Sequence, residues 1–139
     1  MVVLLDSHIE VQPGWLPPLL TRLDEDRTRM VMPHIDSISP KTLATSAGGI
    51  GVLGFMWNMQ EHGIPPLYKD IAMRGTDNTA PLRTPVISGG AMAFNKQYFL
   101  SLGGFDEGMG YWGGEALELS FRVWQCGGKL ELVHCSRVR

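Results

Sequence analysis

Hydrophobic and polar residues follow one another in the first part of this chain in a pattern that predicts strand, helix and strand. Residues 1–5 form a continuous apolar run that ends at Asp6, which is typical of a buried strand. Apolar residues then recur at helical spacing over residues 15–23, and residues 30–32 form a second short apolar run. We therefore expect a βαβ unit with a right-handed connection.

The last third of the chain shows similar patterns around two glycine-rich segments. Residues 86–94 have the composition of a strand that is interrupted by the glycine pair 89–90, where we expect the backbone to approach a ligand. Asn95 is placed to cap a short helix, and residues 129–134 alternate as a strand. The apolar face predicted for the helix between them consists of Leu117, Phe121 and Trp124.

Residues 37–83 break these patterns with closely spaced glycines and the pair Pro65–Pro66. We expect a long, irregular and partly mobile excursion, because loops of this length inside a compact domain are uncommon and are usually functional. The whole pattern predicts an α/β fold in which helices cover a sheet.

Composition and charge restrict the possible functions. The chain has 139 residues, of which 44% are hydrophobic and 19% charged, as in an ordinary globular domain. Its formal net charge is −2, and its 12 basic residues form no stripe that could follow phosphates. Nucleic acid is therefore not an expected partner. No apolar stretch approaches the roughly 20 residues that cross a bilayer.

Asp6 and His8 are candidate metal ligands because they directly follow the first predicted strand. Open α/β sheets bind ligands at the carboxyl ends of their strands. Residues i and i+2 of an extended chain point to the same side, so the two side chains could meet at one cation. A carboxylate with an imidazole suits Mn²⁺ or Zn²⁺ better than Ca²⁺. The alternative is a loop carboxylate that merely lies near a histidine.

Trp112 and Glu115 flank two glycines, a combination that could pack against a sugar and accept hydrogen bonds from its hydroxyls. The alternative is a tight turn that places Glu115 in the first turn of the next helix, where the helix dipole favours it. Cys126 and Cys135 fit neither a redox pair nor a zinc site. Free buried thiols and disulfides to other parts of a longer chain both remain open.

The order of the motifs resembles that of the polypeptide N-acetylgalactosaminyltransferases, glycosyltransferase family 27. The resemblance covers nearly the whole chain and is strongest over residues 83–137. It rests on the segments Asp6-Ser7-His8, Pro33-His34-Ile35-Asp36, Arg83-Thr84-Pro85 to Ser88-Gly89-Gly90, Phe105 to Met109, Trp112-Gly-Gly-Glu115, and Ser120 through Gly128 to Cys135-Ser-Arg137.

This resemblance implies a mixed sheet of the GT-A type flanked by helices. It also implies transfer of N-acetylgalactosamine from UDP-GalNAc to Ser or Thr hydroxyls of proteins, with retention, which initiates mucin-type O-glycosylation. Residues 1–139 would be the metal, donor-sugar and acceptor part of the catalytic domain, without the uridine-binding part before it and the lectin domain after it. The full-length protein would be anchored in the Golgi membrane on the lumenal side.

The family's functional residues map onto eight positions of this chain. Asp6 and His8 would bind Mn²⁺ against the donor diphosphate, with Ser7 between them contacting the substrate. The resemblance places Gly89 and Gly90 beside the donor sugar and implies that the Glu115 carboxylate contacts the sugar hydroxyls. Trp112 would be a loop tryptophan that moves as the site closes, and Trp57 an aromatic residue of the acceptor region.

Three departures from the family pattern limit the implied activity. Ala116 stands where the family has asparagine, and the family's third metal ligand would follow Arg139, a place that His134 should not be taken to fill. The resemblance also pairs the cysteines with partners outside this chain. We expect little transferase activity from the isolated 139 residues. Ala116 leaves a non-catalytic peptide- or glycan-binding relative as the alternative, and an unrelated metal-dependent hydrolase would explain only Asp6 and His8.

Overall fold

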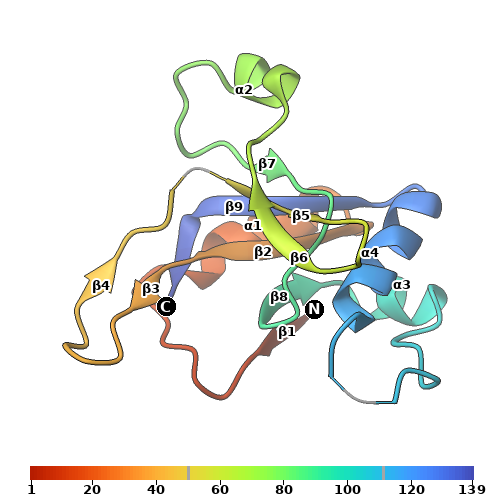
Figure 1. Ribbon diagram of the computed structural model, residues 1–139. Coiled ribbons are helices and arrows are strands. Elements are labelled where there is room, and N and C mark those ends of the chain that lie inside the picture. The colour runs from red at the N-terminus through yellow and green to blue at the C-terminus, as the bar shows by residue number, and fades with distance from the viewer. Residues whose placement is uncertain (50, 111) are drawn as a thin grey trace.

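A five-stranded mixed sheet forms the centre of the molecule (Figure 1). The computed structural model describes residues 1–49, 51–110 and 112–139. Across the sheet the strands lie in the order β1 (Val2–Leu5), β8 (Ala91–Phe94), β2 (Arg29–Ile35), β9 (Lys129–Val138) and β7 (Leu82–Arg83). Only β2 and β9 run parallel, while the β1–β8, β8–β2 and β9–β7 pairs are antiparallel.

The first predicted strand lies at the edge of the sheet and not inside it. β8 lies between β1 and β2, so the strands of the predicted βαβ unit are not neighbours. Residues 2–4 of β1 are accordingly only half-buried, and Leu5 is exposed. The prediction of a buried first strand was wrong because local hydrophobicity does not distinguish an edge strand with one covered face from a central one.

Helices cover both faces of the sheet, as predicted. α1 (Leu16–Glu25) lies behind β2 and β9 in Figure 1, and α4 (Glu115–Gln125) lies on the opposite face. The alternation of the strands explains this arrangement. Met30 and Met32 pack in one cluster with Leu119 of α4, whereas Val31 packs with Leu19 of α1.

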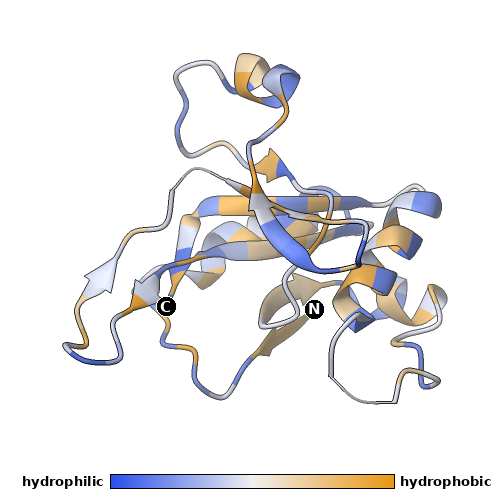
Figure 2. Cartoon of the chain, viewed as in Figure 1, coloured by the Kyte–Doolittle hydropathy of each residue, from blue (hydrophilic) through white to orange (hydrophobic). Residues whose placement is uncertain are grey.

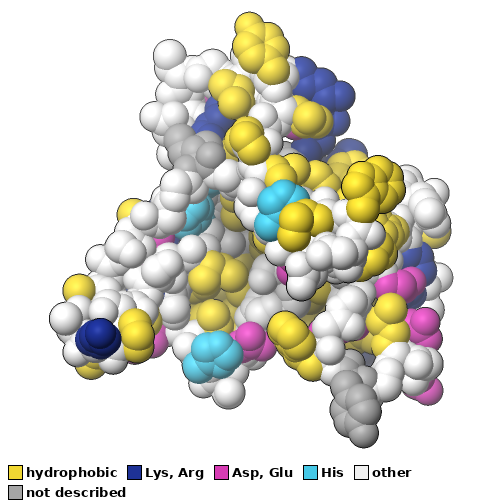
Figure 3. Space-filling view, viewed as in Figure 1, with side chains coloured by type: hydrophobic (Ala, Val, Ile, Leu, Met, Phe, Trp, Pro, Cys, Tyr) yellow, Lys and Arg dark blue, Asp and Glu magenta, His cyan; other side chains and the backbone are white. Residues whose placement is uncertain are grey.

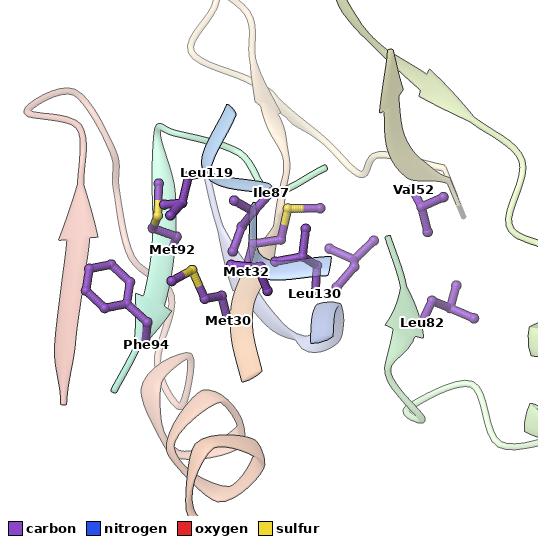
Figure 4. Packing of buried hydrophobic residues seen from close by; sticks show 11 residues of the cluster. Met30, Met32, Val52, Leu82, Ile87, Met92, Phe94, Leu119 and Leu130 are labelled. Carbon is purple, nitrogen blue, oxygen red and sulfur yellow. The ribbon is translucent and has the colours of Figure 1, made fainter. Parts of the chain in front are cut away.

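The larger core runs across the sheet from Phe94 to Leu82 and Val52 (Figure 4). Phe94 contacts Phe99 with 4.6 Å between ring centroids, which joins the sheet to α3 (Lys96–Ser101). Figure 2 shows hydrophobic residues concentrated along the strands and on the helix faces turned toward them, with hydrophilic residues on the outer loops. Burial of these apolar side chains is the main stabilising contribution to the fold.

Local sequence signals account well for the helix starts. Pro17 and Pro18 lie in the first turn of α1, where a missing N–H costs nothing. The side chain of Asn95 accepts hydrogen bonds from the backbone N–H groups of Gln97 and Tyr98 at 2.9 and 3.1 Å, which confirms it as the cap of α3.

The predicted face of α4 was partly wrong. Leu117 is buried, but Phe121 is half-buried and Trp124 is 36% exposed. The side of α4 that faces the sheet is formed by Ala116, Leu117, Leu119, Ser120 and Val123. The broad apolar surface of this helix therefore contacts two partners, the sheet and a hairpin described next.

Residues 37–83 are more regular than the sequence indicated. They contain the two-residue strands β3 (Ser37–Ile38) and β4 (Thr45–Ser46), the hairpin β5 (Val52–Phe55) and β6 (Glu61–Ile64), and the helix α2 (Tyr68–Arg74). The β5–β6 hairpin lies in front of the sheet and α2 projects away from it (Figure 1). Many glycines and short strands conceal this structure from periodicity arguments.

Two strand boundaries also differ from the predictions. Residues 86–90 lead into β8 as irregular backbone, so the strand begins only after the glycine pair. β9 continues beyond residue 134 to Val138, and a bulge separates its two parts.

In the described part of the chain, no helix has the length and apolar character needed to cross a membrane.

Candidate functional site

A pocket of about 970 Å³ opens between the edge of the sheet and the β5–β6 hairpin. In the space-filling view this face is hollowed, with a histidine and acidic side chains at its lower edge (Figure 3). Six of the eight predicted site residues line the pocket. They are Asp6, His8, Gly89, Gly90, Trp112 and Glu115.

The two candidate metal ligands reach the pocket because β1 pairs with β8. The backbone N–H of Asp6 donates a hydrogen bond to the carbonyl oxygen of Gly90 at 2.9 Å. The N–H of Ile9 bonds to the Asp6 carbonyl oxygen at 3.1 Å, which turns the loop back so that His8 also faces the pocket. The antiparallel ladder thus places the DxH segment beside the glycine pair.

Gly90 leaves room for the Asp6 carboxylate. A Cβ atom at residue 90 would lie 2.9 Å from Oδ2 of Asp6, closer than real Cβ contacts come. At Gly89 a Cβ would lie 3.4 Å from the Cβ of Ala116. The glycine pair therefore allows strand β8, the loop that carries Asp6 and α4 to converge on one small space.

A buried serine holds the glycine segment against α4. Ser120 Oγ accepts a hydrogen bond from the N–H of Ile87 at 3.0 Å and donates one to the carbonyl oxygen of Ala116 at 2.5 Å. Ser120 is fully buried, so both bonds are protected from water. This link was not anticipated from sequence, since a serine inside a helix gives no signal of its partners.

Glu115 is the first residue of α4, and it faces the pocket from there. Its Oε2 accepts a hydrogen bond from the N–H of Gly113 at 2.8 Å, which orients the carboxylate. Gly113 and Gly114 have φ angles of 103° and 90°, values that favour glycine. Glu115 is therefore both the start of the helix and a carboxylate that lines the pocket, while its role toward a sugar stays a prediction.

Trp112 lies at the rim of the pocket with 94% of its surface exposed. The loop before it is held at its base by Arg122, whose Nη1 donates to the carbonyl oxygens of Leu102 and Gly104, both at 2.7 Å. The indole is thus mounted on a glycine turn beside Glu115, where a bound ligand could reach it.

One wall of the pocket was not predicted from the sequence, and it is formed by Met56, Met59, Gln60 and Glu61 of the hairpin. The hairpin is held in place by Phe55, which packs edge-to-face on Phe121 of α4 with 5.0 Å between ring centroids. Thr84 Oγ1 also accepts a hydrogen bond from the N–H of Leu53 at 3.1 Å. Desolvation at this wall, and then the nearby Glu115 carboxylate, raise the pKa of Glu61.

The remaining two predicted residues lie elsewhere. Ser7 is exposed in the loop and does not line the pocket. Trp57 is 96% exposed in the hairpin turn, next to Met56, which does line it. Neither placement tests the roles implied by the resemblance, which stay predictions.

The residues present fit a divalent cation, although as a partial ligand set. Asp6 offers a hard oxygen and His8 an imidazole, and the glycine at residue 90 leaves the Asp6 carboxylate free space. Over the described ranges 1–49, 51–110 and 112–139, no three His, Cys, Asp or Glu side chains are grouped to hold a metal. Asp6 and His8 are therefore two candidate ligands, and they would leave the other positions around a cation to non-protein ligands.

Changing Gly90 to alanine tests whether this glycine keeps space for the Asp6 carboxylate. The new methyl group would push the Asp6 carboxylate from its place, while the fold would adapt because the contact is with the end of a side chain. We expect the affinity for Mn²⁺ in the presence of UDP-GalNAc to fall by about 10- to 100-fold, the range for changes that reorient a ligand. Calorimetric titration of the full-length protein measures it. Gly63→Ala is the control, because a Cβ there meets nothing within 4 Å; equal affinities for the two variants would contradict the prediction.

Two protein-family profiles match this chain, and both describe glycosyl- or galactosyltransferases. The profile described as "Glycosyl transferase family 2" matches residues 1–103, and that described as "N-terminal domain of galactosyltransferase" matches residues 72–139. The chain belongs to the glycosyl transferase family 2. This membership and the mixed sheet with flanking helices confirm the predicted fold class.

Within this glycosyl transferase family, the chain is similar to polypeptide N-acetylgalactosaminyltransferases. It is 45% identical over 139 residues to polypeptide N-acetylgalactosaminyltransferase 13 from Homo sapiens, and 49% identical over 141 residues to polypeptide N-acetylgalactosaminyltransferase 16 from Homo sapiens. Each match covers 99% of this chain and 25% of the relative. The resemblance inferred from the motifs is thereby confirmed, and the chain spans about a quarter of the length of these relatives.

A solved structure supports the same assignment. The crystal structure of GalNAc-T7 with UDP, GalNAc and Mn²⁺ superimposes on this glycosyl transferase chain with a TM-score of 0.92 and 35% sequence identity. The match covers 98% of this chain and 26% of that one. The predicted assignment of residues 1–139 to the C-terminal part of a catalytic domain stays a prediction.

The two cysteines are exposed, and among the residues that the structure describes they form no disulfide. Of the two alternatives that the sequence left open, buried free thiols do not fit the structure, since Cys126 caps the end of α4 at the surface and Cys135 lies in the bulge of β9. Pairing with cysteines outside this chain stays a prediction.

Proposed function

We propose that the full-length protein transfers N-acetylgalactosamine from UDP-GalNAc to Ser or Thr hydroxyls of proteins, with retention. The observation that carries the proposal is the convergence of Asp6, His8, the glycine pair and Glu115 on one pocket. Three separate segments of the chain contribute to it, and the motif order alone did not require them to meet. The donor sugar and the acceptor named in the proposal rest on the similarity to the N-acetylgalactosaminyltransferases.

Each residue has a role that its position supports. Asp6 and His8 would hold Mn²⁺, which when bound stabilises negative charge on the leaving diphosphate. The Glu115 carboxylate, oriented by the Gly113 N–H, would accept hydrogen bonds from the sugar hydroxyls. The glycine pair would let the sugar approach the backbone, and Trp112 at the rim would exclude water when the ligand is bound.

By the same resemblance, we propose that the full-length protein acts on the lumenal side of the Golgi membrane and carries a membrane anchor. Protein acceptors that present Ser or Thr would reach the sugar from the hairpin side, where Met56, Met59 and Gln60 form an apolar and amide-bearing wall. The exposed indole of Trp57, in the turn of this hairpin, would contribute to the same surface.

One observation favours a second candidate, a non-catalytic relative that binds peptide or glycan. Ala116 lines the pocket beside Gly89 and offers no polar group to the sugar, where the family pattern has an asparagine. Loss of such hydrogen bonds weakens binding of the transition state more than it weakens the fold. Ala116→Asn in the full-length protein is the direct comparison, because gain of transfer activity on this change would identify the natural protein as the non-catalytic form.

Metal removal provides the main test. We expect the full-length protein to transfer radiolabelled N-acetylgalactosamine to Ser/Thr peptides with Mn²⁺, and to lose at least about 100-fold in rate after chelation, since Lewis-acid stabilisation contributes several kcal/mol. Restoring Mn²⁺ should restore the rate. The isolated 139 residues, assayed in parallel, are expected to show little transfer. Absence of both transfer and Mn²⁺-dependent UDP binding in the full-length protein would overturn the proposal.

A further inference from the structure

Two buried histidines contact each other near the carboxyl end of β2, where the next residue, Ile35, lines the pocket but the histidines themselves do not. Nδ1 of His34 lies 3.2 Å from Nδ1 of His134, and the ring centroids are 5.3 Å apart. The two residues are 6% and 7% exposed. Nε2 of each ring is buried and has no hydrogen-bond partner among the described residues. Neither residue is used by the proposed function.

The pair lies where β9 leaves its regular register with β2. Val133 is opposite Pro33, but the residue opposite His34 is Arg137, so β9 contains three extra residues at this point. His134 is the first residue of this bulge and points to His34. The histidine contact therefore joins the bulge to the neighbouring strand where ladder hydrogen bonds are interrupted.

Beyond the bulge, β9 holds the loop that follows Asp6 and His8. The N–H of Arg139 donates to the carbonyl oxygen of Glu10 at 2.8 Å, and the N–H of Gln12 donates to that of Arg137 at 3.3 Å. Val11 forms a β-bridge with Val138. We call residues 10–12 and 137–139 together the strap. The strap thus fixes the loop that follows His8 to the part of β9 beyond the bulge, whereas Asp6 is also held by its own hydrogen bond to Gly90.

The surroundings of the pair favour uncharged imidazoles. Only one hydrogen atom fits between two facing Nδ1 atoms, so a doubly protonated pair would place N–H against N–H. Burial, and then the charges of Arg74 from α2, His34 and Arg137, lower the pKa of His134 from 6.5 to about 4. Burial and Arg137 lower the pKa of His34, although the Asp36 carboxylate opposes them. Asp36 is itself paired with Arg137 and accepts a hydrogen bond from the N–H of Gly48.

We propose that His34 and His134 are positioning residues that hold the strap, and through it the loop that carries His8, in place only while both imidazoles are uncharged. Because the folded state lowers their proton affinity, the stabilisation is complete above about pH 6.5 and is lost as the pH falls toward 4. The strap should open before the rest of the sheet, since β1 and β8 pair independently of the bulge.

Hydrogen exchange of the 139-residue chain tests the proposal without metal or donor. We expect protection factors of the strap amides of Gln12 and Arg139 to fall by about tenfold between pH 7 and pH 5, while those of the β1–β8 ladder change little. In the double variant His34→Gln, His134→Gln the strap should lose this pH dependence. His62→Gln is the matched control, because His62 is an exposed histidine on β6 and its loss should leave the pH dependence intact.

Strap protection that does not change with pH in the natural chain would overturn the proposal, and so would pH dependence that survives in the double variant. If the double variant does not fold, imidazole NMR of the natural chain decides. Titration of His34 and His134 below their ordinary range, together with the strap amides, supports the proposal, whereas titration of both near pH 6.5 contradicts it.

The consequence for the site rests on the proposed function and has its own measurement. In the full-length protein, Mn²⁺ affinity in the presence of UDP should weaken more steeply from pH 7 to pH 5.5 than in the double variant. If the full-length protein binds no UDP with Mn²⁺ at any pH, the proposed function is refuted. The hydrogen-exchange experiment still tests the role of the histidine pair in that case. An equal slope for the two proteins would contradict the positioning role.

Discussion

Replacing Asp6 with asparagine is expected to lower the Mn²⁺ affinity of the full-length protein by at least about 100-fold in the presence of UDP-GalNAc. The change keeps the shape of the side chain and its backbone hydrogen bond to Gly90, but it removes the only carboxylate of the two-residue ligand set. Among the described residues no third His, Cys, Asp or Glu side chain is grouped with Asp6 and His8, so the change leaves the His8 imidazole alone at this position. Calorimetric titration of Mn²⁺, followed by the transfer rate at saturating Mn²⁺, measures the effect.

Asp24→Asn is the matched control for this change. Asp24 is an exposed carboxylate on α1, outside the pocket, and its loss alters the net charge equally. We expect the control to bind Mn²⁺ like the natural protein. If Asp6→Asn and Asp24→Asn lower the affinity to the same small extent, Asp6 is not a metal ligand, and the DxH segment is an ordinary loop at a strand end.

Replacing Gly128 with alanine is expected to destabilise the fold by about 3 kcal/mol or more, which is at the upper end for overpacking. Gly128 lies between α4 and β9, and its N–H donates to the carbonyl oxygen of Val123 at 2.8 Å. A Cβ atom there would lie 2.8 Å from both the Thr28 carbonyl oxygen and Cγ1 of Val123, and it would also overlap the Tyr98 hydroxyl. Backbone and core side chains surround the position, so no single flexible atom can move aside.

Urea unfolding of the 139-residue chain, followed by circular dichroism, measures this loss. Gly63→Ala serves as the control because a Cβ atom meets no neighbour there. We expect its midpoint to stay close to that of the natural chain. A Gly128→Ala variant with the same midpoint would mean that the junction of α4 and β9 is looser than the contacts indicate.

Local patterns predicted most of the regular elements near the site. The apolar run before Asp6, the Asn95 cap and the strand after Gly128 all have signals that depend on near neighbours in sequence. The candidate ligands were also found from the sequence, because carboxylate, imidazole and glycine pairs at strand and helix ends are chemically distinctive. The resemblance then connected these separate signals into one hypothesis.

Other features depend on contacts between distant segments and were not predicted. The hairpin wall with Glu61 lies in a region rich in glycine, where hydrophobic periodicity is weak. His34 and His134 each occupy a strand in which a histidine has no distinctive spacing, and their contact arises only from the parallel pairing of β2 with a bulged β9. The buried hydroxyl of Ser120 likewise bonds to a partner in another segment, the N–H of Ile87.

Outside residues 37–83, periodicity along the chain therefore indicated most of the strands and helices, because side-chain direction repeats every two residues in a strand and every 3.6 in a helix. The order of the strands was decided by the tertiary structure. Insertion of β8 between β1 and β2 brings Asp6 beside Gly90 and opens the pocket. Such pairing depends on burial and hydrogen bonding summed over the whole sheet, and these are properties that no short stretch of sequence contains.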